Sequence, residues 1–272
     1  MPVSVYDAFA EHAFEGNPAA VVVSDEALDE SLMQRIAGEM NLSETAFLRP
    51  LPGEGRYALR WFTPTAEVDL CGHATLAAGA LVLDRMAGSL DRVTFETRSG
   101  PLRVLRVGRE RYAMEFPRLA VTPLEVPLAA VRELEEALGG RPVGFHASVN
   151  LIADYPGEAE LRALVCDPGR LGRALEALGF WGLSVTAPPA PGADYDFVSR
   201  FFAPRKGIPE DPVTGAAHCA LAPLWAGRLG KRKLLGYQAS RRGGFVGCEL
   251  LEEDRVRLEG ACVRVLAGAL TL

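Results

Sequence analysis

Hydrophobic residues along the chain recur with two periods, one typical of helices and one typical of strands. In Asp29–Met40 the apolar positions fall every three or four residues, which predicts an amphipathic helix. Leu128–Leu138 and Gly169–Leu178 have the same spacing, and a glycine follows each of them, as is common just after a helix. Strands are predicted where β-branched and aromatic residues cluster: at Val3–Phe9, Ala19–Val23, Ala46–Leu48, Arg56–Phe62, Val93–Thr97, Leu102–Val107 and Arg111–Phe116, and within Gly244–Leu272. We expect Pro117–Pro127 to be a linker and Ala187–Ala193 a loop, in a mixed α/β protein.

Part of this pattern occurs twice. Arg60–Pro64 (RWFTP) resembles Arg200–Pro204 (RFFAP), and after a three-residue insertion Leu70–Ala74 (LCGHA) aligns with Val213–Ala217 (VTGAA). Each copy leads into a helix of small residues, predicted at Thr75–Leu83 and His218–Leu229. The repeat favours two similar halves, each with a glycine at a helix start, Gly72 and Gly215. Because free N–H groups and the helix dipole attract anions, two such helix starts facing one cleft would hold a small carboxylate.

Composition and charge exclude several classes of function. The 272 residues carry a formal net charge of −6, which argues against general nucleic-acid binding. No apolar stretch reaches the roughly 18–20 residues that a membrane helix needs. The first basic residue is Arg35, so we expect no secretory or organellar leader. The lysines are only Lys206, Lys231 and Lys233, all in polar context, and neither a phosphate loop nor a dinucleotide-binding glycine motif is present, so we expect no cofactor.

Cysteines and histidines point to a reduced, metal-free protein. The five cysteines are scattered and form no CxxC pair, which suits reduced thiols in the cytoplasm. The four histidines show no paired spacing, so we expect no dedicated zinc site.

Five segments, in order along the chain, resemble the phenazine-biosynthesis PhzF-like family. They are Phe14–Val22 (FEGNPAAVV), Asn41–Phe47 (NLSETAF), Asp69–Thr75 (DLCGHAT), Glu210–Ala220 (EDPVTGAAHCA) and Tyr237–Gly244 (YQASRRGG). The resemblance implies a diaminopimelate-epimerase-like α/β fold. In that fold two pseudo-symmetric halves, each a curled β-sheet around a central helix, enclose the active site between them. We expect the halves at 1–117, joined by the C-terminal strand 264–272, and at 118–263.

The resemblance also implies an activity. Its members include a cofactor-independent isomerase that moves a proton between carbons of a dihydro-hydroxyanthranilate, and homodimers are common in it. By this resemblance Glu44 is the acid/base, and His73 and Asp211 are its polar companions. The expected substrate contacts are Gly72, Gly215, Ala216, Asn17 and Thr214. Ala216 departs from the family's usual serine, which puts the phenazine-type substrate in question more than the proton chemistry.

Other interpretations of these residues stay open in the sequence. Glu44 can be a capping partner of Asn41, Asp211 a loop cap, and His218 a packed helix residue. Cys71 before Gly72 has the form of one thiol of a two-thiol amino-acid racemase, but its repeat partner is Thr214, a far weaker base. A catalytically silent binding protein of the same fold is the third alternative. The basic residues Arg228, Lys231, Arg232 and Lys233 are expected to form a solvated surface.

Overall fold

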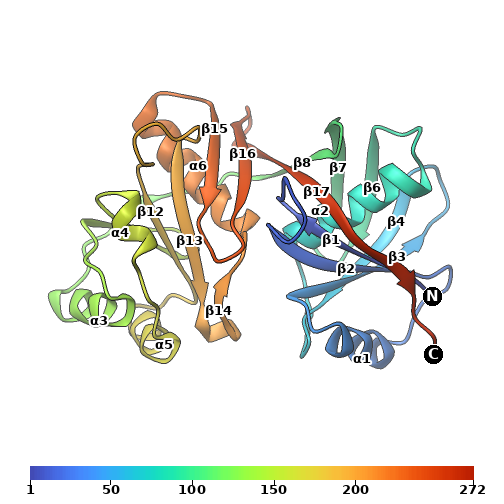
Figure 1. Cartoon of the computed structure of the whole chain (residues 1–272), viewed down its shortest axis with the longest axis horizontal. Coiled ribbons are helices and arrows are strands. Elements are labelled where there is room, and N and C mark those ends of the chain that lie inside the picture. Colours follow the sequence, from blue (N-terminus) through green and yellow to red (C-terminus); the bar gives the residue numbers. More distant parts are fainter. The chain divides into compact units, whose positions relative to one another are not determined.

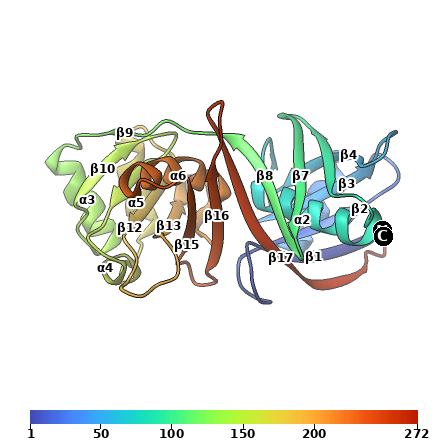
Figure 2. The ribbon, with the colours of Figure 1, turned by 90° about the horizontal axis from the view of Figure 1, so that it is seen from above.

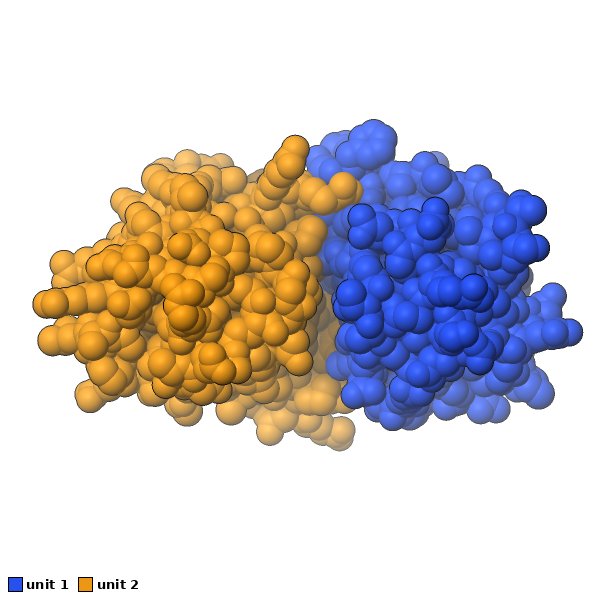
Figure 3. Space-filling model, turned by 90° about the horizontal axis from the view of Figure 1, so that it is seen from below, with its two compact units in different colours: residues 1–115, 259–272 blue, residues 116–258 orange.

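The computed structural model describes residues 1–272, which fold into two compact units (Figures 1 and 3). Unit 1 contains residues 1–115 and 259–272, and unit 2 contains residues 116–258. The predicted division, after residues 117 and 263, lies a few residues from these boundaries. The C-terminal segment belongs to unit 1 because β17 (Arg255–Ala269) pairs antiparallel with the first strand, β1 (Pro2–Ala8).

Unit 1 is a sheet that closes around one helix. The strands pair in the order β8–β7–β6–β4–β3–β2–β1–β17, and β17 pairs with β8 as well. The remaining elements of this unit are β2 (Asn17–Val23), α1 (Glu30–Met40), β3 (Glu44–Pro50), β4 (Arg56–Phe62), β5 (Glu67–Val68), α2 (Gly72–Leu81), the π-helical turn Val82–Met86, β6 (Arg92–Thr97), β7 (Gly100–Gly108) and β8 (Arg111–Pro117).

The enclosed helix is α2, and its composition explains its place. Every residue from His73 to Leu81 is buried, and most of them are small, so strands can approach the helix from all sides. Figure 2 shows α2 lying among β1, β2, β3 and β7. A Cβ atom on Gly79 would come within 2.5 Å of Val104 in β7, so the closest contact requires glycine. The amphipathic helix α1 covers the opposite face of β2 and β3 with Met33, Ile36 and Ala37.

Unit 2 is built around α6 (Gly215–Leu229), whose residues are also mostly small and buried. The helices α3 (Leu128–Leu138) and α5 (Pro168–Ala177) pack on each other and share a second core with β11 and β12. The other elements are β9 (Thr122–Pro123), β10 (Gly144–Ala147), β11 (Leu151–Asp154), α4 (Glu158–Arg162), β12 (Leu183–Ala187), β13 (Phe197–Ala203), the 3-10 turn Pro204–Lys206, β14 (Ile208–Asp211), β15 (Lys233–Gln238) and β16 (Gly244–Leu250).

The two units repeat one pairing scheme. In unit 1, β1–β2, β3–β4, β4–β5 and β6–β7 are antiparallel, whereas β2–β3 and β4–β6 are parallel. In unit 2, β10–β11, β12–β13, β13–β14 and β15–β16 are antiparallel, whereas β11–β12 and β13–β15 are parallel. The strands β1 to β7 of unit 1 therefore correspond, in order, to β10 to β16 of unit 2, and α2 corresponds to α6.

Most elements predicted from the hydrophobic pattern are present. The helices at 29–40, 128–138 and 169–178 are confirmed within a residue or so, as is the strand Arg56–Phe62. The two small-residue helices begin three residues earlier than predicted, at Gly72 and Gly215. The segment Pro117–Pro127 is not wholly a linker, because it contains the short strand β9. No helix is both long and apolar enough to cross a membrane.

Candidate active site

Glu44 is the first residue of β3, which begins two residues before the strand predicted at Ala46–Leu48. It lies beside Ala19 of the parallel strand β2, and only 9% of the residue is exposed. The alternative role as a capping partner of Asn41 is wrong, because Asn41 ends α1 with a left-handed backbone (φ 48°) and begins no helix. Glu44 is therefore a nearly buried carboxylate at the start of an interior strand, which is paired with β2 on one side and β4 on the other.

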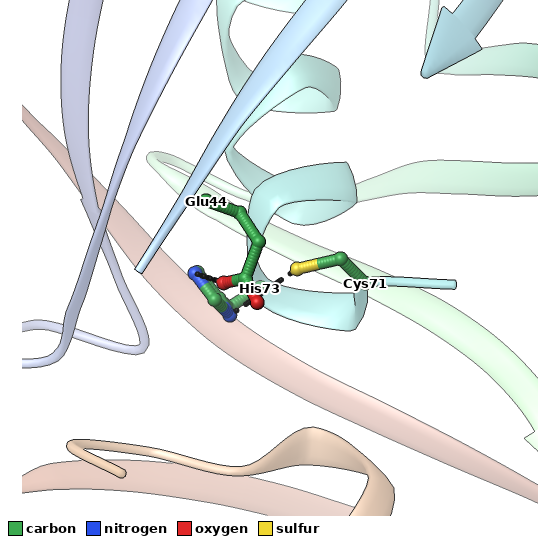
Figure 4. Close-up of side chains that lie close together, drawn as sticks. All are labelled: Glu44, Cys71 and His73. Carbon is green, nitrogen blue, oxygen red and sulfur yellow. Dashed lines mark hydrogen bonds and ion pairs between the residues drawn. The ribbon is translucent and has the colours of Figure 1, made fainter. Parts of the chain in front are cut away.

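His73 follows Gly72, the first residue of α2, and faces Glu44. Its Nε2 atom lies 3.2 Å from Oε2 of Glu44 (Figure 4). Burial lowers the pKa of His73 to about 3, because the charged imidazolium loses its hydration there. The imidazole is thus neutral across the physiological range.

Cys71 is the N-cap residue of α2 and completes a group of three side chains. Its Sγ lies 3.5 Å from Nδ1 of His73, so the imidazole contacts sulfur through one nitrogen and the carboxylate through the other (Figure 4). The sulfur, nitrogen and oxygen atoms that the three residues offer all lie within 4.8 Å of one another. This donor set can hold a metal ion such as zinc, so the expected absence of metal stays a prediction.

Asn17 supports the segment that precedes Glu44. It is the first residue of β2, is fully buried, and its Oδ1 accepts a hydrogen bond from Ser43 Oγ at 3.2 Å. Because Ser43 directly precedes Glu44, this contact orders the backbone at the start of β3. Asn17 therefore has a positioning contact in addition to its predicted role as a substrate contact. Ser43 lies within the NLSET segment but was not predicted to take part.

The other predicted site residues lie in unit 2, at the start of α6. Asp211 ends β14, and its Oδ2 accepts a hydrogen bond from the Thr214 hydroxyl at 2.5 Å. Thr214 is the N-cap residue, and Gly215 and Ala216 form the first turn. The buried side chain of Gln238 holds this turn: its Oε1 accepts from Thr214 N at 2.9 Å, and its Nε2 donates to Asp211 O at 2.8 Å. Sequence reasoning gave Gln238 no such structural role, although it lies in the YQASRRGG segment.

Glu44 and His73 of unit 1 have no counterparts at the corresponding positions of unit 2. The equivalent residues Arg60 and Arg200 pair with Phe47 and Val185 on the neighbouring strands. Glu44 lies three residues before Phe47, and Gly182 lies three residues before Val185. Gly182 is therefore the position in unit 2 that corresponds to Glu44. A Cβ atom on Gly182 would lie 3.0 Å from the Phe201 ring and 3.1 Å from Asn150 Oδ1, which leaves little room for a side chain. At the helix starts, His73 corresponds to Ala216. Unit 2 thus has the same scaffold without an equivalent of the Glu44–His73 pair at the start of its central helix.

Two residue groups have the structural role, rather than a catalytic or binding role, that the sequence predicted for them. His218 is fully buried in α6, lies 5.8 Å from the Phe197 ring, and is a packed helix residue. The basic residues at 228–233 do not form a free cationic patch, because each has a partner. Arg228 binds Asp154, Lys231 binds Asp196, Lys233 binds Glu249, and Arg232 donates to Leu250 O.

Comparisons with known proteins agree with this architecture. The family profile described as PhzC-PhzF, phenazine biosynthesis-like protein, matches residues 6–268. An uncharacterized isomerase of Pseudomonas aeruginosa is 46% identical over 267 residues, covering 98% of this chain and 97% of that protein. A crystal structure of a putative phenazine biosynthesis PhzC/PhzF protein from Clostridium difficile superposes with a TM-score of 0.91 and 38% identity, covering both chains completely. A probable proline racemase from Agrobacterium radiobacter shares the fold, with a TM-score of 0.65 and 13% identity over 100% of this chain and 93% of that chain.

Proposed function

The chain belongs to the PhzC-PhzF phenazine biosynthesis-like family and is an isomerase, and from this premise we propose that it moves a proton between carbons of a small carboxylate substrate without a cofactor. Glu44 is the acid–base in this proposal. The observation that carries it is the nearly buried carboxylate 3.2 Å from a neutral imidazole. Proton removal from carbon by a carboxylate requires that bulk water be kept away from it, and burial at the start of β3 does so.

The start of α2 supplies the second part of the mechanism. Removing a proton next to a carboxylate builds enolate-like negative charge on the substrate. Backbone N–H groups at a helix start stabilise such charge, and Gly72 allows close approach to them. The start of α6, with Gly215, Ala216, Thr214 and Asp211, is proposed to bind substrate through the same kind of N–H groups. Glu44 then returns the proton to a different carbon.

The two-thiol racemase is the less favoured alternative. The position that corresponds to Cys71 is occupied by Thr214, which offers no thiol. The nearest cysteine in α6 is Cys219, which is buried and whose pKa is raised to about 12 by that burial. A thiol with so high a pKa is a poor proton carrier near neutral pH. One acid–base carboxylate therefore fits the described residues better than two thiols.

The proposal keeps three further expectations from the sequence: a homodimer, a cytoplasmic location and a protein free of metal. None of the five cysteines forms a disulfide, which is consistent with a reducing compartment. The proposal names the substrate only by class, as a small conjugated carboxylate, because Ala216 stands where the family often has serine.

The test is exchange of carbon-bound hydrogen with deuterated water, followed by NMR on a dihydro-hydroxyanthranilate. We expect Glu44→Gln, which keeps the shape but removes the base, to slow exchange by at least about 10²-fold while ligand binding changes little. Glu96→Gln, which alters an exposed ion pair with Arg56, is the matched control and should leave exchange unchanged.

Two results would contradict the proposal. Exchange that persists in Glu44→Gln but is lost in Cys71→Ser would support the thiol mechanism. No exchange in the wild-type protein, with binding retained, would support a silent binding protein. Dialysis against a chelator should leave the wild-type rate unchanged, because no step requires a metal.

A further inference from the structure

Cys71 stands at the N-cap position of α2. Its contacts, rather than helix capping, explain why a cysteine occupies this position. Ser, Thr, Asp and Asn are the usual N-cap residues because their oxygens accept hydrogen bonds from the first turn. Cys71 makes no such capping bond, and its buried sulfur instead lies 3.5 Å from Nδ1 of His73. The thiol is therefore directed at the imidazole.

We infer that Cys71 is a positioning residue whose S–H donates to Nδ1 of His73 and holds the imidazole with its hydrogen on Nε2, toward Glu44. The inference rests on the proposed function, since it concerns the partner of the acid–base. It adds a role for the thiol that is distinct from carrying the substrate's proton.

The argument follows from what each group can donate or accept. A neutral imidazole has one N–H donor and one acceptor nitrogen, and burial keeps His73 neutral. An ionised carboxylate only accepts, so the nitrogen 3.2 Å from Glu44 Oε2 should carry the hydrogen. With the hydrogen on Nδ1 instead, the Nε2 lone pair would face the carboxylate oxygen. The remaining nitrogen, Nδ1, is then an acceptor, and the Cys71 thiol is the donor beside it.

Unit 2 provides the opposite arrangement and so a comparison within the same molecule. Nδ1 of His218 lies 2.8 Å from the carbonyl oxygen of Thr214, and a carbonyl oxygen can only accept. His218 must therefore carry its hydrogen on Nδ1. Two buried neutral histidines, one in each central helix, are thus expected in opposite tautomers, and only His73 has a thiol beside Nδ1.

The consequence for the proposed reaction is control of Glu44. With the hydrogen on Nε2, an N–H dipole rather than a lone pair lies 3.2 Å from the carboxylate oxygen, which favours the orientation in which Glu44 takes the proton from the substrate. If the tautomer were free to change, part of the population would present a lone pair to Glu44 and turn the carboxylate away. The thiol keeps its own proton throughout, so no charge moves through Cys71.

The experiment is long-range ¹H–¹⁵N NMR of the histidine rings in the full-length protein, which distinguishes protonated from unprotonated ring nitrogens. His73→Gln and His218→Gln each remove one set of signals and so assign them. We expect the wild-type His73 to carry hydrogen on Nε2 and His218 on Nδ1. In Cys71→Ala we expect the His73 signals to show a mixture of tautomers, while the His218 signals stay unchanged and report an intact fold.

Activity gives the second readout. Loss of one weak hydrogen bond should slow deuterium exchange by about tenfold in Cys71→Ala, with the pH profile unchanged, because no titrating group is removed. Cys71→Ser retains a donor and should keep the His73 tautomer and more of the rate than Cys71→Ala.

The inference is overturned if wild-type His73 carries its hydrogen on Nδ1, or if Cys71→Ala leaves the His73 signals as they were. Failure of the proposed function is a different result: Glu44→Gln would then keep its exchange rate while the histidine spectra still show the expected tautomers.

Discussion

Unit 1 and unit 2 share a scaffold but differ in the side chains at the start of their central helices. Arg60 Nε lies 2.7 Å from Glu67 Oε1 in unit 1, and Arg200 Nε lies 2.7 Å from Glu210 Oε1 in unit 2. Both guanidinium groups also lie over a phenylalanine ring of the same strand, at 5.2 and 5.1 Å from its centroid. The duplication thus extends from strand pairing to individual ion pairs.

The loop before each helix is held in the same way. Ser99 Oγ donates to Asp69 O at 2.7 Å, and Ser240 Oγ donates to Pro212 O at 2.7 Å. In each unit the carbonyl held in this way lies three residues before the first residue of the central helix. The Glu44–His73 pair has no equivalent at the start of α6, because Gly182 and Ala216 stand at the corresponding positions in unit 2. The comparison teaches that the scaffold positions a helix start in both units, whereas the proposed acid–base chemistry depends on two side chains that only unit 1 has there.

The largest expected effect separates the two helix starts. His73→Gln should lower the exchange rate by at least about 10²-fold, because Glu44 loses its neutral neighbour. Ala216→Ser, at the corresponding position of α6, should change the rate by less than about tenfold, since the added hydroxyl alters substrate contact rather than proton transfer. Steady-state rates of both variants on one substrate provide the measurement. Equal losses would show that both helix starts act in the chemistry.

A smaller effect should distinguish the two arginines. Arg200 is 11% exposed in its side chain and also donates to the Leu161 and Leu164 carbonyls, so Arg200→Met leaves several buried acceptors unsatisfied. We expect a loss of about 3 kcal/mol in the free energy of unfolding. Arg60→Met should lose about 1 kcal/mol, because Glu67 keeps Arg98 as a partner at 2.5 Å. Urea unfolding curves measure both, and similar losses would contradict this ranking.

The two units should differ least in how their stability depends on pH, because each has one buried neutral histidine in its central helix. Burial lowers the pKa of His73 to about 3 and of His218 to about 4, whereas an unfolded histidine titrates near 6.5. Between about pH 6.5 and 4 the unfolded chain binds protons that the folded chain does not, so stability falls as pH falls. At pH 4.5 we expect each histidine to account for a loss of about 2 kcal/mol.

This pH dependence can be assigned to each unit with variants. His73→Gln and His218→Gln should each flatten the fall in unfolding free energy between pH 6.5 and 4.5 by a similar amount, and the double variant should flatten it by about the sum. Chemical denaturation at several pH values gives these slopes. A variant that keeps the wild-type slope would show that its histidine is protonated in the folded protein.

The sequence by itself determined the local elements and the internal duplication. Helical periodicity located α1, α3 and α5, and the paired RWFTP and RFFAP segments located the corresponding strands β4 and β13. Short strands such as β10, β11 and β12 were missed, because four or five residues carry too little periodicity to distinguish a strand from a loop. The NLSETAF and DLCGHAT segments also pointed to Glu44 and His73 through their resemblance to a family.

Only the tertiary structure decided the chemistry around those two residues. Glu44 and His73 lie far apart in the chain, and they meet because β3 pairs with β2 and α2 is buried against both strands. The lowered pKa of His73 arises from that burial, and the contact of Cys71 with Nδ1 arises from the turn at the helix start. Periodicity reports which face of an element is apolar. Desolvation and side-chain contacts depend on which distant elements cover that face, so they appear only when the chain is folded.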